Sequence, residues 1–533
     1  MEASLATEAA HDLFVLSDLH MGRGINPETR RYFTLENFFF DEDFAKLAHF
    51  LCADAAARQS KFRLILNGDT FDLLRIDPLP EESEQASRRE RRFGPTHTPL
   101  QAARTVREIL AGHPAFVRAL AQVLHAGHSL VFLPGNHDLE LQWAPVQQSV
   151  RDALAEQLAG SYGEASLGRL DDLSFGQWFY HEPGRIWVEH GCQYDPENSF
   201  RYLLRGRFGD HFADALAQRR PRAANEPTDA KSDPTDDAFY ELEQDMPLGN
   251  FFQRYLFNAF GHITFIVPST RANLRYVKWL LFNAPGLLFR VLFSHGPFSF
   301  QVLRRIGSQA NRSALRVLAR THQQALDDLC ERHGLGDKLR EIDQMKEVRA
   351  DAVQAARSIG WQMLKFAAGV VSVGMGVSAL YLAFLSLLSK FVLGGGSYAF
   401  LLLMSPVIVT MAAIGGVIYS LMGANEDISP RPLRRAAQRI ATTLHVPVVS
   451  FGHSHDEELW RLDLPDGGRA WYCNTGTWIA VFTHDVLVPR ERIQYTFLRV
   501  RGQNAELLQW SPSRAEPMPV ILLDESAVPT PPA

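Results

Sequence analysis

Five short apolar runs, each followed at once by residues that can bind a metal ion, constrain the fold of this chain most. Their length and their apolar, partly β-branched composition are typical of buried strands. Amphipathic stretches at 44–58 and 100–126 lie between runs and have the apolar spacing of helices packed on a sheet. The sequence therefore predicts an α/β domain. The predicted strands are 14–16, 62–66, 130–133, 186–188 and 446–451.

A polar motif follows each predicted strand. In chain order the motifs are DLH at 18–20, GDTFD at 68–72, GNHD at 135–138, HG at 190–191 and GHSH at 452–455. Open α/β sheets bind ligands at strand ends, so we expect these side chains to meet. Each motif alone is more often a turn or a core segment, but their joint occurrence in this order indicates a site. The candidate metal ligands are Asp18, His20, Asp69, Asn136, His190, His453 and His455.

Carboxylate, imidazole and amide groups form a mixed nitrogen and oxygen ligand set. Such a set suits Mn, Fe or Zn, and the absence of thiolates argues against a soft metal. The candidates are too many for one tetrahedral ion but suffice for two divalent metal ions that share a carboxylate. We expect Mn, with Fe or Zn as alternatives. Two ions about 3.5 to 4 Å apart can activate a bridging hydroxide for in-line attack at phosphorus.

The five motifs, in this order, resemble those of the calcineurin-like metallophosphoesterase superfamily. The resemblance covers roughly 12–200 and 445–482 and implies a two-sheet sandwich flanked by helices. It also implies catalytic roles for His137, beside the substrate, and Asp138, which would orient the His137 ring. Asp72 could accept a hydrogen bond from a ligand imidazole or be a turn residue. The implied ligands are Asp18, His20 and His455 for the first metal, Asn136, His190 and His453 for the second, and Asp69 as the bridge.

One branch of the superfamily is closest in sequence. The runs at 17–22 and 68–72 resemble the UDP-2,3-diacylglucosamine diphosphatases of lipid A synthesis, which carry a helical lid between the HG and GHxH elements. This chain has its large insertion at the same point. His137 departs from that branch, which typically has arginine there. Protein Ser/Thr phosphatases carry GDxxDRG and GNHE, unlike this chain. We therefore expect a phosphomonoester, phosphodiester or pyrophosphate substrate, with a lipid-linked one as the nearest interpretation.

Two long charge-free runs, 366–389 and 391–425, are each long enough to cross a bilayer. Basic residues gather outside both runs, so by the positive-inside rule both outer ends face the cytoplasm. We expect a multi-pass protein of the cytoplasmic or inner membrane with its catalytic domain facing the cytoplasm. A hairpin buried inside a large soluble protein is the alternative. The N-terminus lacks a secretory signal, and four scattered cysteines indicate no disulfide framework.

The insertion is locally basic, with no Asp or Glu from 251 to 326, and it is rich in aromatic residues. Such a segment can attract anionic headgroups, either as a substrate lid or as a plain anchor. The formal net charge of -6 gives no reason to expect a nucleic-acid partner.

Composition divides the chain into six parts, and the oligomeric state stays open. There are two alternatives to a phosphoesterase: a non-catalytic membrane scaffold or sensor, and a nuclease. A missing ligand would favour a scaffold, and a nuclease should have a basic groove without membrane spans. The predicted parts are a metallophosphoesterase domain at 1–218 and 425–515, a disordered linker at 219–238, a basic aromatic helical insertion at 239–360, a transmembrane helical hairpin at 361–424 and a disordered tail at 516–533.

Overall fold

The chain is described here by a computed structural model, and it consists of two compact units. The first unit is Met1–Arg349 with Pro430–Ala533, and the second is Ala350–Ser429. The sheets, the cores and the candidate site all lie in the first unit. The structure describes residues 11–77, 94, 98–205, 245–254, 265–266, 286, 312–348, 380–381, 383–384, 386, 431–465, 467–482, 491–502 and 504–520.

A seven-stranded mixed sheet carries the first three motifs. Its strand order is β15-β14-β13-β1-β2-β3-β4. Strands β1 to β4 are parallel, whereas β13 pairs antiparallel with β1, and β14 and β15 continue the antiparallel part. The strands are β1 (Asp12–Leu16), β2 (Phe62–Asn67), β3 (Ser129–Leu133), β4 (Leu173–Phe175), β13 (Thr496–Arg501), β14 (Asn504–Ser511) and β15 (Glu516–Pro519).

A five-stranded mixed sheet carries the other two motifs. Its order is β5-β6-β8-β10-β9, with β6, β8 and β10 parallel and the two edge strands antiparallel. Three short strands form a separate sheet in the order β12-β11-β7. The strands are β5 (Phe179–Glu182), β6 (Ile186–Glu189), β8 (Val448–Phe451), β9 (Glu457–Asp463) and β10 (Arg469–Thr475), and in the small sheet β7 (Phe265–Ile266), β11 (Ala480–Phe482) and β12 (Glu491–Ile493).

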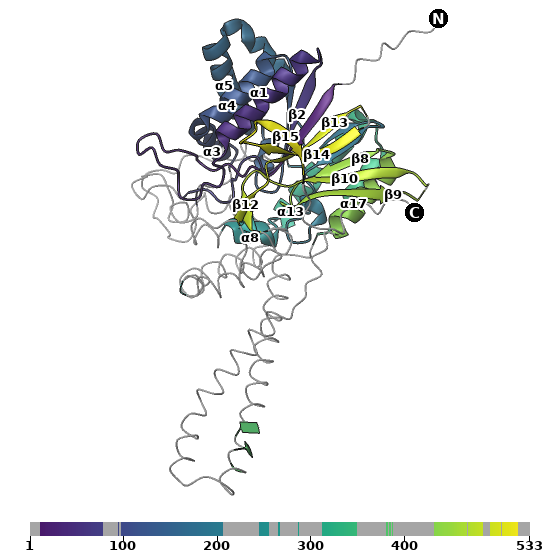
Figure 1. Cartoon of the computed structure of the whole chain (residues 1–533). Helices are drawn as coiled ribbons and strands as arrows, with labels where there is room; N and C mark the ends of the chain where they lie inside the picture. The colour runs from purple at the N-terminus through teal and green to yellow at the C-terminus, as the bar shows by residue number, and fades with distance from the viewer. Residues whose placement is uncertain are drawn as a thin grey trace, which may run out of the picture. The chain divides into compact units, whose positions relative to one another are not determined.

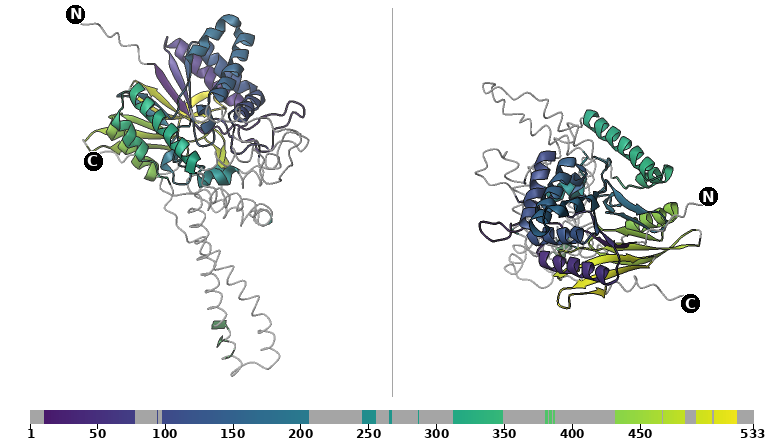
Figure 2. Two further views of the ribbon diagram at one scale, coloured as in Figure 1. Left: turned by 180° about the vertical axis from the view of Figure 1, so that it is seen from behind. Right: turned by 90° about the horizontal axis from the view of Figure 1, so that it is seen from above.

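Helices cover the outer faces of both large sheets (Figures 1 and 2). Side chains of α1, α3, α4 and α5 pack on the first sheet, and those of α13, α14 and α17 pack on the second. The helices are α1 (Asp41–Ala57), α3 (Pro99–Gly112), α4 (Pro114–His125), α5 (Ala144–Tyr162), α8 (Leu248–Phe252), α13 (Arg312–Arg332), α14 (Asp337–Gln344) and α17 (Arg431–Leu444), with short 3-10 turns η1 (Leu139–Gln142), η2 (Glu164–Asp172) and η3 (Cys192–Tyr194).

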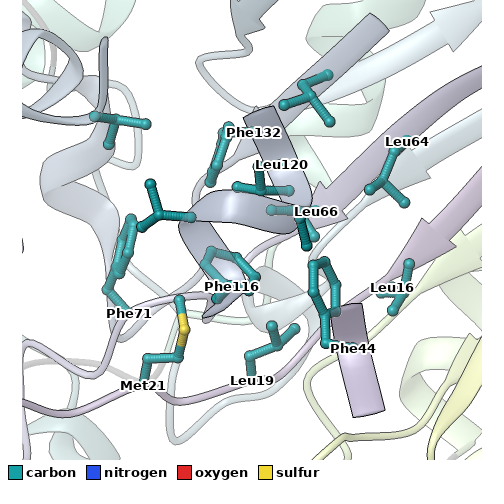
Figure 3. Close-up of a cluster of buried hydrophobic side chains, with 14 of the residues drawn as sticks. Leu16, Leu19, Met21, Phe44, Leu64, Leu66, Phe71, Phe116, Leu120 and Phe132 are labelled. Carbon is teal, nitrogen blue, oxygen red and sulfur yellow. The ribbon is translucent and has the colours of Figure 1, made fainter. Parts of the chain in front are cut away.

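Both faces of the central strands are buried, which explains why they read as continuous apolar runs. In β1, Phe14 and Leu16 belong to the core under the helices, whereas Leu13 and Val15 belong to the core between the two sheets. Figure 3 shows the helix-side core, where Leu16 lies close to Phe44 of α1. The result is an α/β sandwich of two sheets with helices outside.

The five predicted strands are confirmed as β1, β2, β3, β6 and β8. The predicted helix at 44–58 is confirmed as α1. The amphipathic stretch at 100–126 is not one helix, because it divides into α3 and α4 at Pro114. Proline has no N–H to donate and disfavours helical geometry in the residue before it. His113 accordingly leaves the helical region, with φ -121° and ψ 57°.

Several predicted segments fall largely outside the described residues. These are the linker at 219–238, most of the insertion before α13, and the hairpin at 361–424 apart from five positions. No helix within the described ranges is long and apolar enough to cross a membrane. The predicted disordered tail at 516–533 starts too early, because β15 pairs with β14 through Leu508 and Pro519.

Truncation of a side chain in the core between the sheets should destabilise the fold more than truncation of an exposed side chain. Ile65 is completely buried there, whereas Ile25 is 40% exposed. We expect Ile65→Ala to lower the free energy of unfolding by about 2 to 5 kcal/mol, because it leaves a cavity. Ile25→Ala should change it by less than about 0.5 kcal/mol. Urea unfolding curves measure both, and equal effects would contradict this placement of the core.

Candidate metal centre

The five polar motifs lie at the carboxyl ends of β1, β2, β3, β6 and β8. Within each sheet these strands are parallel, so their ends share one edge. Main-chain hydrogen bonds join the loops beyond that edge. The N–H of His20 donates to the carbonyl of Asp69 (2.8 Å), and the N–H of Gly452 donates to the carbonyl of His190 (3.0 Å). In each sheet, loops that carry different motifs are therefore joined to one another.

The structure brings all the predicted ligands together. Two groups of buried side chains, each with its ligand atoms within 4.8 Å of one another, share Asp69. Asn136 joins the second group because its Oδ1 lies 3.0 Å from Nδ1 of His453. A carboxylate common to two groups is the arrangement that a bridging ligand needs. The groups are Asp18, His20, Asp69 and His455, and Asp69, His190 and His453.

The ligand loops have an unusual backbone. Positive φ is uncommon outside glycine and strained for most side chains, costing on the order of 1 to 3 kcal/mol per residue. Five predicted ligands have it, with φ between 46° and 70°. Such strain persists only where surrounding contacts impose it, and it concentrates at functional sites. The five residues are Asp18, His20, Asp69, His453 and His455.

Three glycines in the motifs let these loops approach closely. A Cβ at Gly68 would collide with the His190 ring, and one at Gly135 would collide with the Asp69 carboxylate. A Cβ at Gly452 would collide with Ser17 and Asp18. The glycines are therefore needed for space at the centre.

Outer partners turn one nitrogen of each of three imidazoles away from the centre. Nδ1 of His190 donates to the carbonyl of Asn67 (3.0 Å), and Nε2 of His453 donates to the Asp195 carboxylate (2.9 Å). Nδ1 of His20 lies 3.4 Å from Asp72 Oδ2. Such partners select the tautomer in which the opposite nitrogen faces inward with its lone pair.

The inward atoms are crowded and rich in lone pairs. Nε2 of His20 lies 2.9 Å from Nε2 of His455, which lies 3.2 Å from Asp18 Oδ1. Nε2 of His190 lies 3.2 Å from Asp69 Oδ2. Asp18 Oδ1 and His190 Nε2 are buried and make no hydrogen bond. Buried polar atoms without a partner are costly, and a divalent cation would satisfy all of them. These groups fit a metal ion.

Mutual pairing shifts the protonation of these groups. Burial lowers the pKa of the His20 imidazole, but Asp18, Asp72 and Asp69 outweigh it and raise that pKa to about 10. Burial also lowers the pKa of His190, but Asp69 and Asp18 raise it to about 9. The same imidazoles hold the pKa of Asp69 well below its usual range, although burial acts to raise it. In the metal-free protein, protons on the imidazoles supply the positive charge that a bound cation would otherwise supply.

The sequence analysis predicted that Asp138 orients the His137 ring, but the structure gives Asp138 different partners. Its carboxylate accepts four main-chain N–H groups, from Gly135, Asp69, Thr70 and Phe71. It therefore ties the third motif to the second. The His137 ring instead places Nδ1 2.8 Å from Asp72 Oδ1. The Asp138 carboxylate is therefore occupied by main-chain N–H groups. Asp72 also accepts the main-chain N–H of Arg75 in its own turn.

Three supporting residues escaped the sequence analysis. Asp195 is the partner of His453, and its position five residues after His190 was the only local signal. Asn250 lies in the segment that follows the predicted linker, and its side chain pairs with Asn136. No sequence pattern marked it. Asn474 donates to the carbonyl of Gly452 and supports the fifth motif.

Comparison with known proteins adds no family assignment. No protein-family model matches the chain, and no curated protein matches it. The resemblance to metallophosphoesterases therefore rests on the five motifs.

Adding a side chain at Gly135, where the backbone lies against the Asp69 carboxylate, should disrupt the centre. We expect Gly135→Ala to weaken Mn binding by roughly 10-fold or more, because the added Cβ pushes against the carboxylate shared by both groups. Gly160→Ala, in α5, is the matched control, since its Cβ would meet nothing within 4 Å. Calorimetric Mn titration measures both. Wild-type affinity in Gly135→Ala would contradict the close approach.

Metal binding should release protons and strengthen as pH rises. At pH 7 the metal-free protein carries protons on His20 and His190, whose pKa values are raised to about 10 and about 9. These protonated imidazoles stabilise the folded, metal-free protein. Their contribution is complete below the unfolded pKa of about 6.5 and is lost as pH rises through 9 and 10. Coordination needs neutral imidazole, so about two protons should leave per chain. Calorimetry in buffers of different ionisation enthalpy counts them, and a count of zero would contradict this assignment.

Proposed function

We propose that the chain is a dinuclear metal-dependent hydrolase of phosphoesters. The observation that carries the proposal is the convergence of two buried ligand groups on one shared carboxylate, that of Asp69. Nitrogen and oxygen ligands of this kind suit Mn first, with Fe or Zn as alternatives. The order of the motifs favours the calcineurin-like metallophosphoesterase branch of such enzymes.

Two ions would divide the candidate ligands between them. Asp69 would contact both, because its Oδ2 lies 3.6 Å from His20 Nε2 and 3.2 Å from His190 Nε2. When bound, the ion pair would supply an acidified water and would stabilise charge on the attacking and leaving oxygens. The first ion would be held by Asp18, His20 and His455, and the second by Asn136, His190 and His453.

His137 is the residue proposed to handle a proton beside the substrate. Its Nδ1 contacts Asp72, and its ring lies edge-on to the His20 ring at a centroid distance of 4.5 Å. With Nδ1–H donated to the carboxylate, the opposite nitrogen can carry the proton that a leaving alkoxide needs. General acid catalysis of this kind contributes about 100-fold to 10,000-fold.

A lipid-linked phosphoester is the substrate class that we favour. The charge-free runs at 366–389 and 391–425 and the acid-free segment at 251–326 suit a protein at an inner membrane, facing the cytoplasm. The ion pair itself serves monoesters, diesters and pyrophosphates alike. No predicted ligand is absent from the site, which favours catalysis over a scaffold that retains only the fold.

Hydrolysis should depend on the shared carboxylate and on His137 in different ways. Purified protein with Mn should hydrolyse generic phosphoesters, and it should favour members of a panel of phospholipids and nucleotide-linked lipids over those generic esters. Asp69→Asn should lower kcat by roughly 1,000-fold or more, because several kcal/mol of charge stabilisation are lost. His137→Ala should lower kcat by about 100-fold or more while leaving Mn binding intact.

Two exposed residues supply matched controls. Asp463 has a side chain that is 81% exposed, and His125 is exposed at the end of α4. Asp463→Asn and His125→Ala should keep wild-type turnover. Equal turnover by Asp69→Asn would contradict the proposed mechanism, and Mn binding without hydrolysis of any ester would favour a non-catalytic scaffold.

A further inference from the structure

The segment at 245–254 resumes the described chain after the predicted linker and reaches the metal centre. Asn250, 1% exposed, forms a pair of hydrogen bonds with Asn136. We infer that Asn250 is a positioning residue that fixes the Asn136 amide with its oxygen toward the second metal position. This inference rests on the proposed function, because it assigns a role within the same centre.

The direction of each hydrogen bond follows from one group that cannot be reversed. The main-chain carbonyl of Asn136 can only accept, so Nδ2 of Asn250 must face it, and it does so at 2.8 Å. That places Oδ1 of Asn250 toward the Asn136 side chain, where it accepts from Nδ2 of Asn136 (3.2 Å). The remaining amide atom of Asn136, Oδ1, then faces His453 (3.0 Å).

A reversed Asn136 amide would be penalised on both sides. Its oxygen would face the oxygen of Asn250, and its NH₂ group would face the cation position, where a ligand must offer a lone pair. An amide is otherwise free to present either end. Asn250 therefore determines whether Asn136 can serve as a metal ligand.

Asn250 is itself held in place by contacts on both sides along the segment. Asp245 accepts the N–H groups of Arg201 and Tyr202 at 3.2 and 2.9 Å. Gly249 donates to the carbonyl of Glu197 at 2.8 Å, and Arg254 donates to the carbonyl of Leu73 at 3.1 Å. The segment is thus docked on the loop after η3 and beside the second motif.

The same loop also supports His453, a further proposed ligand of this position. Asp195 accepts from His453, and Asn198 donates to the same Asp195 oxygen at 2.7 Å. Asn198 lies against Gly249, where an added Cβ would collide with its side chain. His453 is therefore positioned by Asp195, before the predicted linker, and Asn136 by Asn250, after it. At the first position, His20 is supported by Asp72.

The test is Mn binding by wild type and by Asn250→Leu, which keeps the branched shape of the side chain but removes both hydrogen bonds. We expect one of two Mn ions to bind roughly 10-fold to 100-fold more weakly, since outer partners of metal ligands have effects of this size. The other ion should be unaffected. Because Asn250 acts through Asn136, the effect should be largely absent when Asn136→Ala is already present, and it should be additive with His455→Ala.

Asn37→Leu is the matched control, because Asn37 is also buried and donates to a main-chain carbonyl, that of Leu35. It should bind both ions as wild type does. Two tight ions in Asn250→Leu, or equal weakening of both ions, would overturn the inference while leaving the proposed function intact. A wild-type chain that binds no pair of ions would overturn both. If Asn250→Leu fails to fold by circular dichroism, Asn250→Ala carries the same expectations.

Discussion

The arrangement of this site depends on the interaction between buried carboxylates and imidazoles around Asp69. Asp69 lies where the two ligand groups meet, and its other oxygen accepts the main-chain N–H of His137 at 2.8 Å. Burial of such charges is unfavourable unless they are paired, hydrogen-bonded or bound to a cation. Raised imidazole pKa values and a lowered carboxylate pKa are the result of that pairing in the metal-free chain. A cation pair would replace these protons with a charge that does not titrate.

The scaffold around the centre holds strained loops in place. Ligands with positive φ would relax if their loops were free, and Asp138 opposes this by binding four main-chain N–H groups from two motifs. Glycines at the closest contacts remove the side chains that would otherwise separate the loops. The core between the two sheets separates the motif loops of one sheet from those of the other. Preorganisation of this kind favours metal binding, because less conformational freedom is lost when the ligands already converge.

The two metal positions that we propose differ in the residues that support them. The first position is supported from within the second motif, through Asp72, which also contacts His137. Support for the second comes from Asp195 and Asn250, on opposite sides of residues 206–244. In this arrangement, docking of the segment at 245–254 and completion of the second position are coupled. Chemistry at phosphorus, as we propose it, would then require that segment to be in place.

Features that depend on local pattern could be predicted from the sequence. An apolar run followed by Asp, Asn or His predicted β1, β2, β3, β6 and β8 and the side chains that meet in the candidate site, because the end of a buried strand is recognisable from adjacent residues. Features that depend on which distant residues meet were decided by the tertiary structure alone. They include Asp72 rather than Asp138 as the partner of His137, Asp195 at His453, Asn250 at Asn136, and the pairing of β15. A carboxylate or amide binds whichever donor the fold places within about 3 Å, and residues far apart in the chain carry no local mark of that encounter.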